Sequence, residues 1–151
     1  MMRRVMSVGF ILLLTLGAFT VPLHGQDAGG GTPPGVRERG FSLEQNYPNP
    51  FNPSTTIPFV LGEQLFEDGK PVVVTIRILN LLRQLVAIPT ALNHPDGSGV
   101  PVQDLVYTTP GPKQAYWDGL DRAGNKVASG IYIVQLIVNG QSTMRRVVVT
   151  K

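Results

Sequence analysis

Apolar and polar residues alternate with a period of two along much of the chain, which is the pattern of half-buried β-strands. In residues 72–79 this alternation predicts that Val74, Ile76 and Ile78 are buried while Thr75 and Arg77 face solvent. Comparable runs occur at residues 55–61, 84–88, 102–108, 114–117, 131–138 and 142–150. No helical periodicity of useful length occurs after the first 25 residues, so the pattern predicts an all-β chain.

Turn signals separate these runs at intervals of roughly eight to twelve residues. Asn139-Gly140 predicts a type I′ hairpin turn between the last two strands. Pro58 predicts that residues 55–61 lie at a sheet edge, because proline has no N–H for a neighbouring strand. Residues 110–112 (Pro-Gly-Pro) predict a break before 114–117. About seven short strands with such turns predict an immunoglobulin-like antiparallel β-sandwich.

Residues 1–25 predict a secretory signal peptide. Arg3 and Arg4 precede an apolar run, and Pro22 comes shortly before a plausible cleavage site near Gly25. A membrane anchor is the alternative, but the apolar run is marginal in length for spanning a bilayer. Residues 26–40 are rich in Gly, Pro and charge, which predicts a flexible, disordered linker before a domain at 41–151.

Residues 41–53 predict an extended segment, because Pro48, Pro50 and Pro53 each fix φ and remove a backbone donor. Such a segment suits the edge of a domain rather than a central strand. Its apolar side chains are expected to point inward as anchors: Phe41, Leu43, Tyr47 and Phe51.

Residues 117–132 hold the only tryptophan and predict a compact corner between two strands. Gly119, Gly124 and Gly130 stand where the chain needs a positive φ to reverse direction. The side chains of Asp118, Asp121 and Asn125 are suited to Asx turns within the loop.

These two blocks resemble the C-terminal sorting domains (type A) of the bacterial type IX secretion system, which are related to the immunoglobulin-like domain of flagellar hook-capping proteins. The first block is Phe41-Ser42-Leu43-Glu44-Gln45-Asn46-Tyr47-Pro48-Asn49-Pro50-Phe51-Asn52-Pro53-Ser54-Thr55-Thr56-Ile57. The second runs from Trp117-Asp118-Gly119 through Asp121 and Gly124 to Gly130-Ile131-Tyr132. Hook-capping proteins are not expected to carry a cleavable leader, which favours the sorting domain. The resemblance implies a non-catalytic module that directs an exported protein across the outer membrane.

The resemblance also implies partners and a route. The Sec translocon would export the chain, the outer-membrane type IX machinery would recognise the folded domain, and a sortase-like protease would cut within Gly35 to Gly40. The product would reach the cell surface or the extracellular space as a monomer. Recognition by edge pairing and shape is expected at the C-terminal hairpin, whose candidate residues are Gly130, Tyr132, Arg145, Arg146, Val147, Val149 and Lys151.

Three features depart from the family pattern. Arg83 stands where a glycine is usual, and since an arginine at positive φ costs about 1 kcal/mol, a different turn type is expected. Residues 89–101 are an insertion, in which His94 and Asp96 are expected to be solvated. Only residues 26–40 stand where a large cargo is usual, so the cargo stays open, as does the question of whether the chain is a fragment.

Composition narrows the function classes. The chain has no cysteine, which excludes disulfides and thiolate metal sites. Of its 13 Lys and Arg side chains, Arg3 and Arg4 lie in the leader, so the remainder nearly balance the 10 acidic ones and indicate no nucleic-acid footprint. No catalytic set, metal site or cofactor site is expected. The alternative function is a cell-surface module that is structural or binds carbohydrate or protein, with Tyr116 and Trp117 as candidate sugar-stacking rings.

Overall fold

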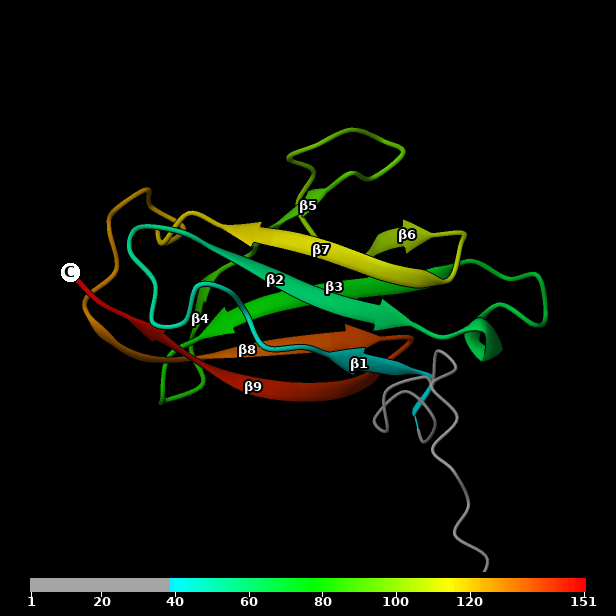
Figure 1. The fold of residues 1–151 in the computed structure, drawn as a ribbon, viewed down its shortest axis with the longest axis horizontal. Coiled ribbons are helices and arrows are strands. Elements are labelled where there is room, and N and C mark those ends of the chain that lie inside the picture. The colour runs from blue at the N-terminus through cyan, green and yellow to red at the C-terminus, as the bar shows by residue number, and fades with distance from the viewer. Residues whose placement is uncertain (1–38) are drawn as a thin grey trace, which may run out of the picture. The chain divides into compact units, whose positions relative to one another are not determined.

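The structure is a computed structural model that describes residues 39–151, and the predictions for residues 1–38 lie outside them. Residues 39–151 form nine strands and one short 3-10 turn (Figure 1). The strands are β1 (Phe41–Leu43), β2 (Thr55–Leu61), β3 (Val72–Leu79), β4 (Leu85–Ala87), β5 (Thr90–Leu92), β6 (Leu105–Tyr107), β7 (Gly111–Trp117), β8 (Gly130–Val138) and β9 (Gln141–Val149), with the turn η1 at Glu63–Leu65.

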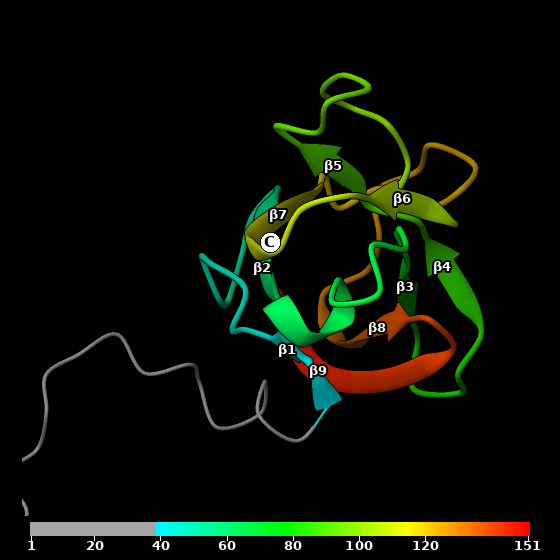
Figure 2. The ribbon, with the colours of Figure 1, turned by 90° about the vertical axis from the view of Figure 1, so that its right-hand side faces the viewer.

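The strands pair into two antiparallel sheets that enclose one core (Figure 2). Sheet A has the order β1-β2-β7-β5, and sheet B has the order β4-β3-β8-β9 with β6 paired to the start of β3. The predicted all-β, immunoglobulin-like sandwich is confirmed. The strand number exceeds the prediction partly because β5 forms in a segment predicted to be a loop.

Alternation of side chains builds the core as predicted. Ile57, Phe59 and Leu61 of β2 face Val74, Ile76 and Ile78 of β3 across the interior, and all six are completely buried. Val134, Leu136 and Val138 of β8 belong to the same cluster. Thr75, predicted to face solvent, is buried instead. The reason is a partner from a distant loop: its hydroxyl accepts the backbone N–H of Asp104 at 2.9 Å and lies 3.3 Å from the Asp104 carboxylate.

Two prolines sit deeper in sheet A than the sequence predicted. The expectation that β2 is an edge strand is wrong, because β1 and β7 flank it. The Pro58 carbonyl accepts the N–H of Glu44 at 3.0 Å, so the nitrogen of Pro58 is directed to the same side, where β1 has just ended. The predicted break at 110–112 is also wrong, since Gly111 and Pro112 open β7 opposite Leu61 and Val60.

The hairpin turns explain how sheet B is connected. Asn139 and Gly140 have φ of 47° and 84°, as a type I′ turn requires. Arg83 also keeps a positive φ, of 61°, so the expectation of a different turn type is wrong. The turn is held by Asn80, whose carbonyl accepts the N–H of Arg83 at 2.9 Å and whose side chain accepts the N–H of Gln84 at 2.9 Å.

Within the 89–101 insertion, His94 is packed whereas Asp96 is exposed as expected. His94 is only 7% exposed, and its ring lies 4.8 Å from the ring of Tyr107. Its Nδ1 accepts the N–H of Asp96 at 3.1 Å, which leaves Nε2 to donate to the Val106 carbonyl at 2.9 Å. The histidine therefore anchors the insertion to β6, and the expectation that it is solvated is wrong.

Candidate functional site

The two sequence blocks meet in space at one corner of the sandwich. The rings of Phe51 and Trp117, both almost completely buried, pack edge to face with centroids 5.2 Å apart. Trp117 packs in the same way against Tyr132 at 5.7 Å. Edge-to-face pairs stabilise beyond the area that they bury. The proline-rich block, the glycine-rich loop and the start of β8 are therefore joined through three rings.

Gly119 brings the blocks into backbone contact. Its φ is +75°, and a Cβ built on it would overlap the carbonyl oxygen of Pro53 and lie 3.5 Å from Cε2 of Phe51. Only glycine combines that conformation with that approach. Gly124 and Gly130 also have positive φ values, as predicted, but a Cβ at either would meet nothing within 4 Å.

The loop after Trp117 is ordered by its own aspartates. Asp118 Oδ1 accepts the N–H of Leu120 at 3.0 Å, while Asp121 Oδ1 accepts those of Ala123 at 2.8 Å and Asn125 at 2.9 Å. The predicted Asx turns at both aspartates are confirmed. The hydrogen bond from the Asn125 backbone is the main cause that lowers the pKa of Asp121 below its ordinary 3.8. The carboxylates of Asp118 and Asp121 therefore stabilise the conformation of the loop.

The proline-rich block pairs with the end of β9. The Phe51 N–H donates to the Val148 carbonyl at 3.0 Å, and the Thr150 N–H donates to the Phe51 carbonyl at 3.0 Å. Asn49 Oδ1 accepts the N–H of Val148, also at 3.0 Å. The outer edge of the last strand is thus occupied by the chain's own Asn49–Phe51 segment.

The N-terminal segment of the domain also contacts the first half of β9. Arg145 Nε donates to the Leu43 carbonyl at 3.0 Å, and Arg39 Nη1 lies 3.4 Å from the Thr143 hydroxyl. Residues 39–51 therefore run beside β9 over most of its length, and β1 lies next to β9 in both views (Figures 1 and 2). This segment closes one side of the sandwich between the two sheets.

The recognition candidates do not form one surface. Val147 and Val149 belong to the core, and Arg145 is tied to β1. Gly130, Arg146 and Lys151 are exposed, whereas the half-buried Tyr132 donates its hydroxyl to the Ala128 carbonyl at 3.0 Å.

Most of the predicted fold positions of the first block are structural, with one exception. Phe41, Leu43 and Phe51 are buried as expected. Asn46 is buried and donates to Thr55 Oγ1 at 2.9 Å and to the Pro48 carbonyl at 3.1 Å. Tyr47 is 51% exposed, so its predicted inward orientation is wrong. Its hydroxyl instead accepts a hydrogen bond from Gln114 Nε2 at 2.9 Å on the outer face of sheet A.

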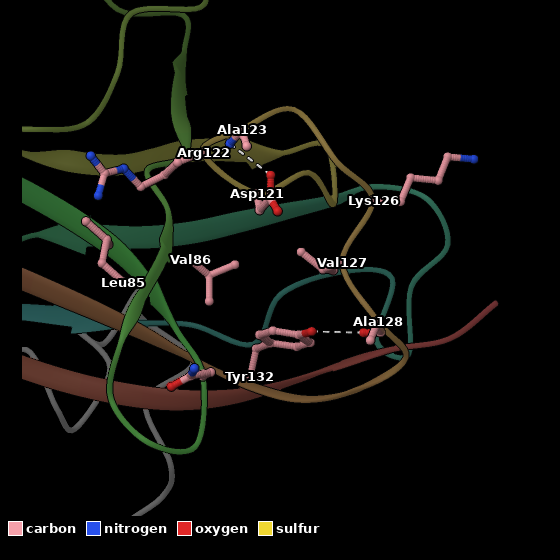
Figure 3. A pocket seen from close by; sticks show the side chains of 10 residues that line it. Leu85, Val86, Asp121, Arg122, Ala123, Lys126, Val127, Ala128 and Tyr132 are labelled. Carbon is pink, nitrogen blue, oxygen red and sulfur yellow. Dashed lines mark hydrogen bonds between the residues drawn. The ribbon is translucent and has the colours of Figure 1, made fainter.

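An open cavity of about 680 Å³ lies between β4 and the loop after Trp117 (Figure 3). Leu85, Val86, Val127 and Tyr132 give it apolar walls, while the side chains of Arg122 and Lys126 extend in opposite directions at its rim. A smaller cavity of about 260 Å³ is bounded by Pro53, Gly119 and Lys151. The sequence did not predict Leu85, Val86 or Arg122 here, because only the folded loop brings them together.

Within residues 39–151, no helix is long and apolar enough to cross a bilayer, and no group of three or more His, Asp or Glu is placed to hold a metal ion. The geometry at the corner is that of a rigid, hydrogen-bonded surface. A partner could recognise this surface by its shape, its exposed backbone and its exposed side chains.

The domain is an all-β immunoglobulin-like sandwich whose C-terminal strand β9 is bordered by the proline-rich block. The structure is similar to dimeric latent PorU from Porphyromonas gingivalis, with a TM-score of 0.51, 19% identity and 73% of this chain covered. PorZ, described as an essential surface component of the type IX secretion system of that organism, matches with a TM-score of 0.44 and 20% identity over 80% of this chain. The chain spans only 9% and 13% of those proteins, and the PorU match shows similarity of fold alone. No protein-family model and no curated protein matches the sequence.

Proposed function

We propose that residues 41–151 are a non-catalytic sorting domain that directs an exported protein across the outer membrane through the type IX secretion system. One observation carries the proposal: the two blocks that resemble the sorting-domain family pack against each other through Phe51, Trp117 and Gly119. The two segments are far apart in the sequence but form one corner of the fold. This contact supports reading both motifs as parts of the same domain signature. The similarity of fold to PorU is consistent with that role.

In this proposal the leader sends the chain through the Sec translocon, and the folded sandwich is recognised at the outer membrane. A sortase-like protease cuts within Gly35 to Gly40 and releases the cargo or leaves it at the cell surface. The mechanism differs from the edge pairing expected from sequence, because Asn49 and Phe51 already occupy the end of the β9 edge. Recognition of an exposed face of the folded domain fits this geometry better than addition of a strand.

The experiment is a secretion assay with a reporter protein inserted at Gly31 of the full chain. The same gene is expressed in a type IX-competent host and in that host without its type IX machinery, and the mature N-terminus is sequenced. We expect extracellular reporter, cut within Gly35 to Gly40, only in the competent host. Equal, uncut product from both hosts would sink the proposal. Deleting residues 144–151 would not serve as the control, because it also removes the core residues Val147 and Val149.

A specific observation favours the alternative of a surface module that binds carbohydrate. Tyr47 lies opposite Thr56, and Thr56 lies opposite Tyr116, so two tyrosines that are 51% and 37% exposed share the outer face of sheet A. Trp117 is buried and does not contribute. Glycan-array binding that is lost in Tyr47→Ala and Tyr116→Ala, together with host-independent localisation, would favour this function over sorting.

A further inference from the structure

The outer face of sheet B is unusually apolar for a surface. Along β8 and β9 the residues that alternate with the core point outward, and directly opposed pairs include Ile131 with Val148 and Gln135 with Met144. Ile131 is 43% exposed and Met144 is 40% exposed. We call this surface the sheet B face; its apolar members are Ile131, Ile133, Ile137, Met144 and Val148.

The charged side chains that the strands contribute to this face are all arginines. Arg77 of β3 stands opposite Gln135, and Arg146 of β9 stands opposite Ile133, so two arginines flank the apolar row. The strands of sheet B contain no Asp or Glu, and the carboxylate of Asp104, from the loop before β6, lies against the Thr75 hydroxyl. Among residues 39–151, the ion pairs involve only Lys70 with Asp68 and His94 with Asp96, so these arginines have no carboxylate partner there.

The β3–β4 turn adds a third arginine from the side. Arg83 Nη1 lies 3.5 Å from the Met144 sulfur, although Arg83 belongs to the turn after β3 and Met144 to β9. The turn therefore reaches past β8, and Figures 1 and 2 show it descending to the level of β9. Leu81 and Leu82, at the tip of the same turn, are 64% and 80% exposed. A left-handed residue that places a cation over an apolar row is a feature that packing of the core does not require.

We propose that the sheet B face docks an acidic surface of a folded protein partner. Three arginines without a carboxylate partner among residues 39–151, on a sheet whose strands carry no Asp or Glu, call for negative charge on the partner. Arg, Met and branched apolar residues, with no Lys on these strands, match the composition of protein–protein interface cores rather than that of a lipid-binding surface. The inference deepens the proposed sorting function, since it names the face that the secretion machinery would contact.

The test uses the full chain with the reporter at Gly31. Arg83→Glu combined with Arg146→Glu reverses the charge at two positions of the sheet B face. Lys70→Glu is the control, because Lys70 is an exposed cation in the loop before β3. All variants are first compared by thermal unfolding, so that only chains with equal midpoints enter the assay. We expect the double variant to lower export about tenfold or more, and the control to leave it unchanged.

A second measurement identifies the partner. A photoreactive phenylalanine replaces Ile133 on the sheet B face or, as a control, Thr56 on sheet A, and adducts formed in the host are identified by mass spectrometry. The purified adduct partner is then titrated with wild type and both variants. Binding of wild type should weaken with added salt, and the double variant should bind about tenfold more weakly and without that salt-induced loss, while the Lys70 variant should bind like wild type.

The outcomes separate this inference from the sorting function. Host-dependent export of wild type and double variant alike, with no adduct from position 133, overturns the docking face but leaves sorting intact. Host-independent export overturns the sorting function. In that case the docking face is tested by two results alone, namely the adduct formed at position 133 and the loss of partner binding in the double arginine variant. Arginine-dependent binding to phosphatidylglycerol vesicles without any protein adduct would overturn the proposal in favour of a lipid surface.

Discussion

The α-carbon of Gly119 lies so close to the carbonyl of Pro53 that a side chain at position 119 would overlap the oxygen. The two residues belong to the two sequence blocks that suggested the family, and they are far apart in the sequence. Their contact places the loop after Trp117 against the segment that borders β9. Position 119 in the second block must therefore be glycine because Pro53 of the first block packs against it.

Gly119→Ala should destabilise the domain more than Gly124→Ala. Both positions have a positive φ, 75° and 84°, so both substitutions bring a conformational cost of about 1 kcal/mol. Only position 119 adds the overlap with Pro53, for which a further loss of about 1–3 kcal/mol is expected. Urea unfolding of the two variants measures the difference directly. Equal losses would mean that the Pro53 contact relaxes without cost.

Asn49→Ala should loosen the end of β9. The Asn49 side chain accepts the Val148 N–H, and loss of this exposed bond should cost about 0.5–1.5 kcal/mol. Hydrogen exchange at the Val148 amide should become faster, while amides in the β8–β9 ladder keep their rates. Asn52→Ala is the matched control, because Asn52 is exposed in the same segment and its side chain does not bond β9. Faster exchange in both variants would assign the effect to the segment and not to the Asn49 bond.

Sequence patterns predicted the sheets well because they depend on local alternation. Val74, Ile76 and Ile78 are buried as the period of two requires, and Asn139-Gly140 forms its hairpin turn. Thr75 departs from the pattern because its partner, Asp104, comes from a distant loop. Local periodicity contains no information about such a partner.

The site was harder to predict for the same reason. Val147 and Val149 were candidates for recognition, yet their alternation with Arg146 and Val148 already indicated burial, and they are core residues. That the edge of β9 is covered depends on where Asn49 and Phe51 pack after folding, which no pattern in either segment reveals. Arg83 could be noted as an unusual turn residue, but its position over Met144 required the structure.

Tyr107→Phe should stabilise the domain at high pH. Burial raises the Tyr107 pKa from 10.0 to about 12. The unfolded chain therefore ionises this phenol first, so the stabilisation is complete below pH 10 and is lost as the pH rises toward 12. The variant removes that loss. At neutral pH it should gain about 1 kcal/mol, because the buried hydroxyl has no hydrogen-bond partner among residues 39–151.

The measurement for Tyr107 is the free energy of unfolding between pH 8 and pH 11 in wild type and variant. Tyr116→Phe serves as the control, since Tyr116 is 37% exposed and its phenol faces solvent in both states. The wild-type curve should fall faster than that of Tyr107→Phe above pH 10, with the control parallel to wild type. Parallel curves for all three proteins would contradict the assigned burial of the Tyr107 hydroxyl.

Asp121→Asn should make the loop after Trp117 insensitive to acid. Hydrogen bonds, first of all that from the Asn125 backbone, lower the Asp121 pKa below 3.8. The ionised form therefore stabilises the folded loop above that pH, and the contribution is lost as the pH falls through the lowered pKa. Asparagine keeps an accepting oxygen but does not titrate. Exchange at the Ala123 and Asn125 amides should accelerate on acidification in wild type more than in the variant, after correction for intrinsic rates. Asp118→Asn, in the neighbouring turn, should leave that acceleration in place, and if it abolishes the acceleration as well, the titrating group is not Asp121.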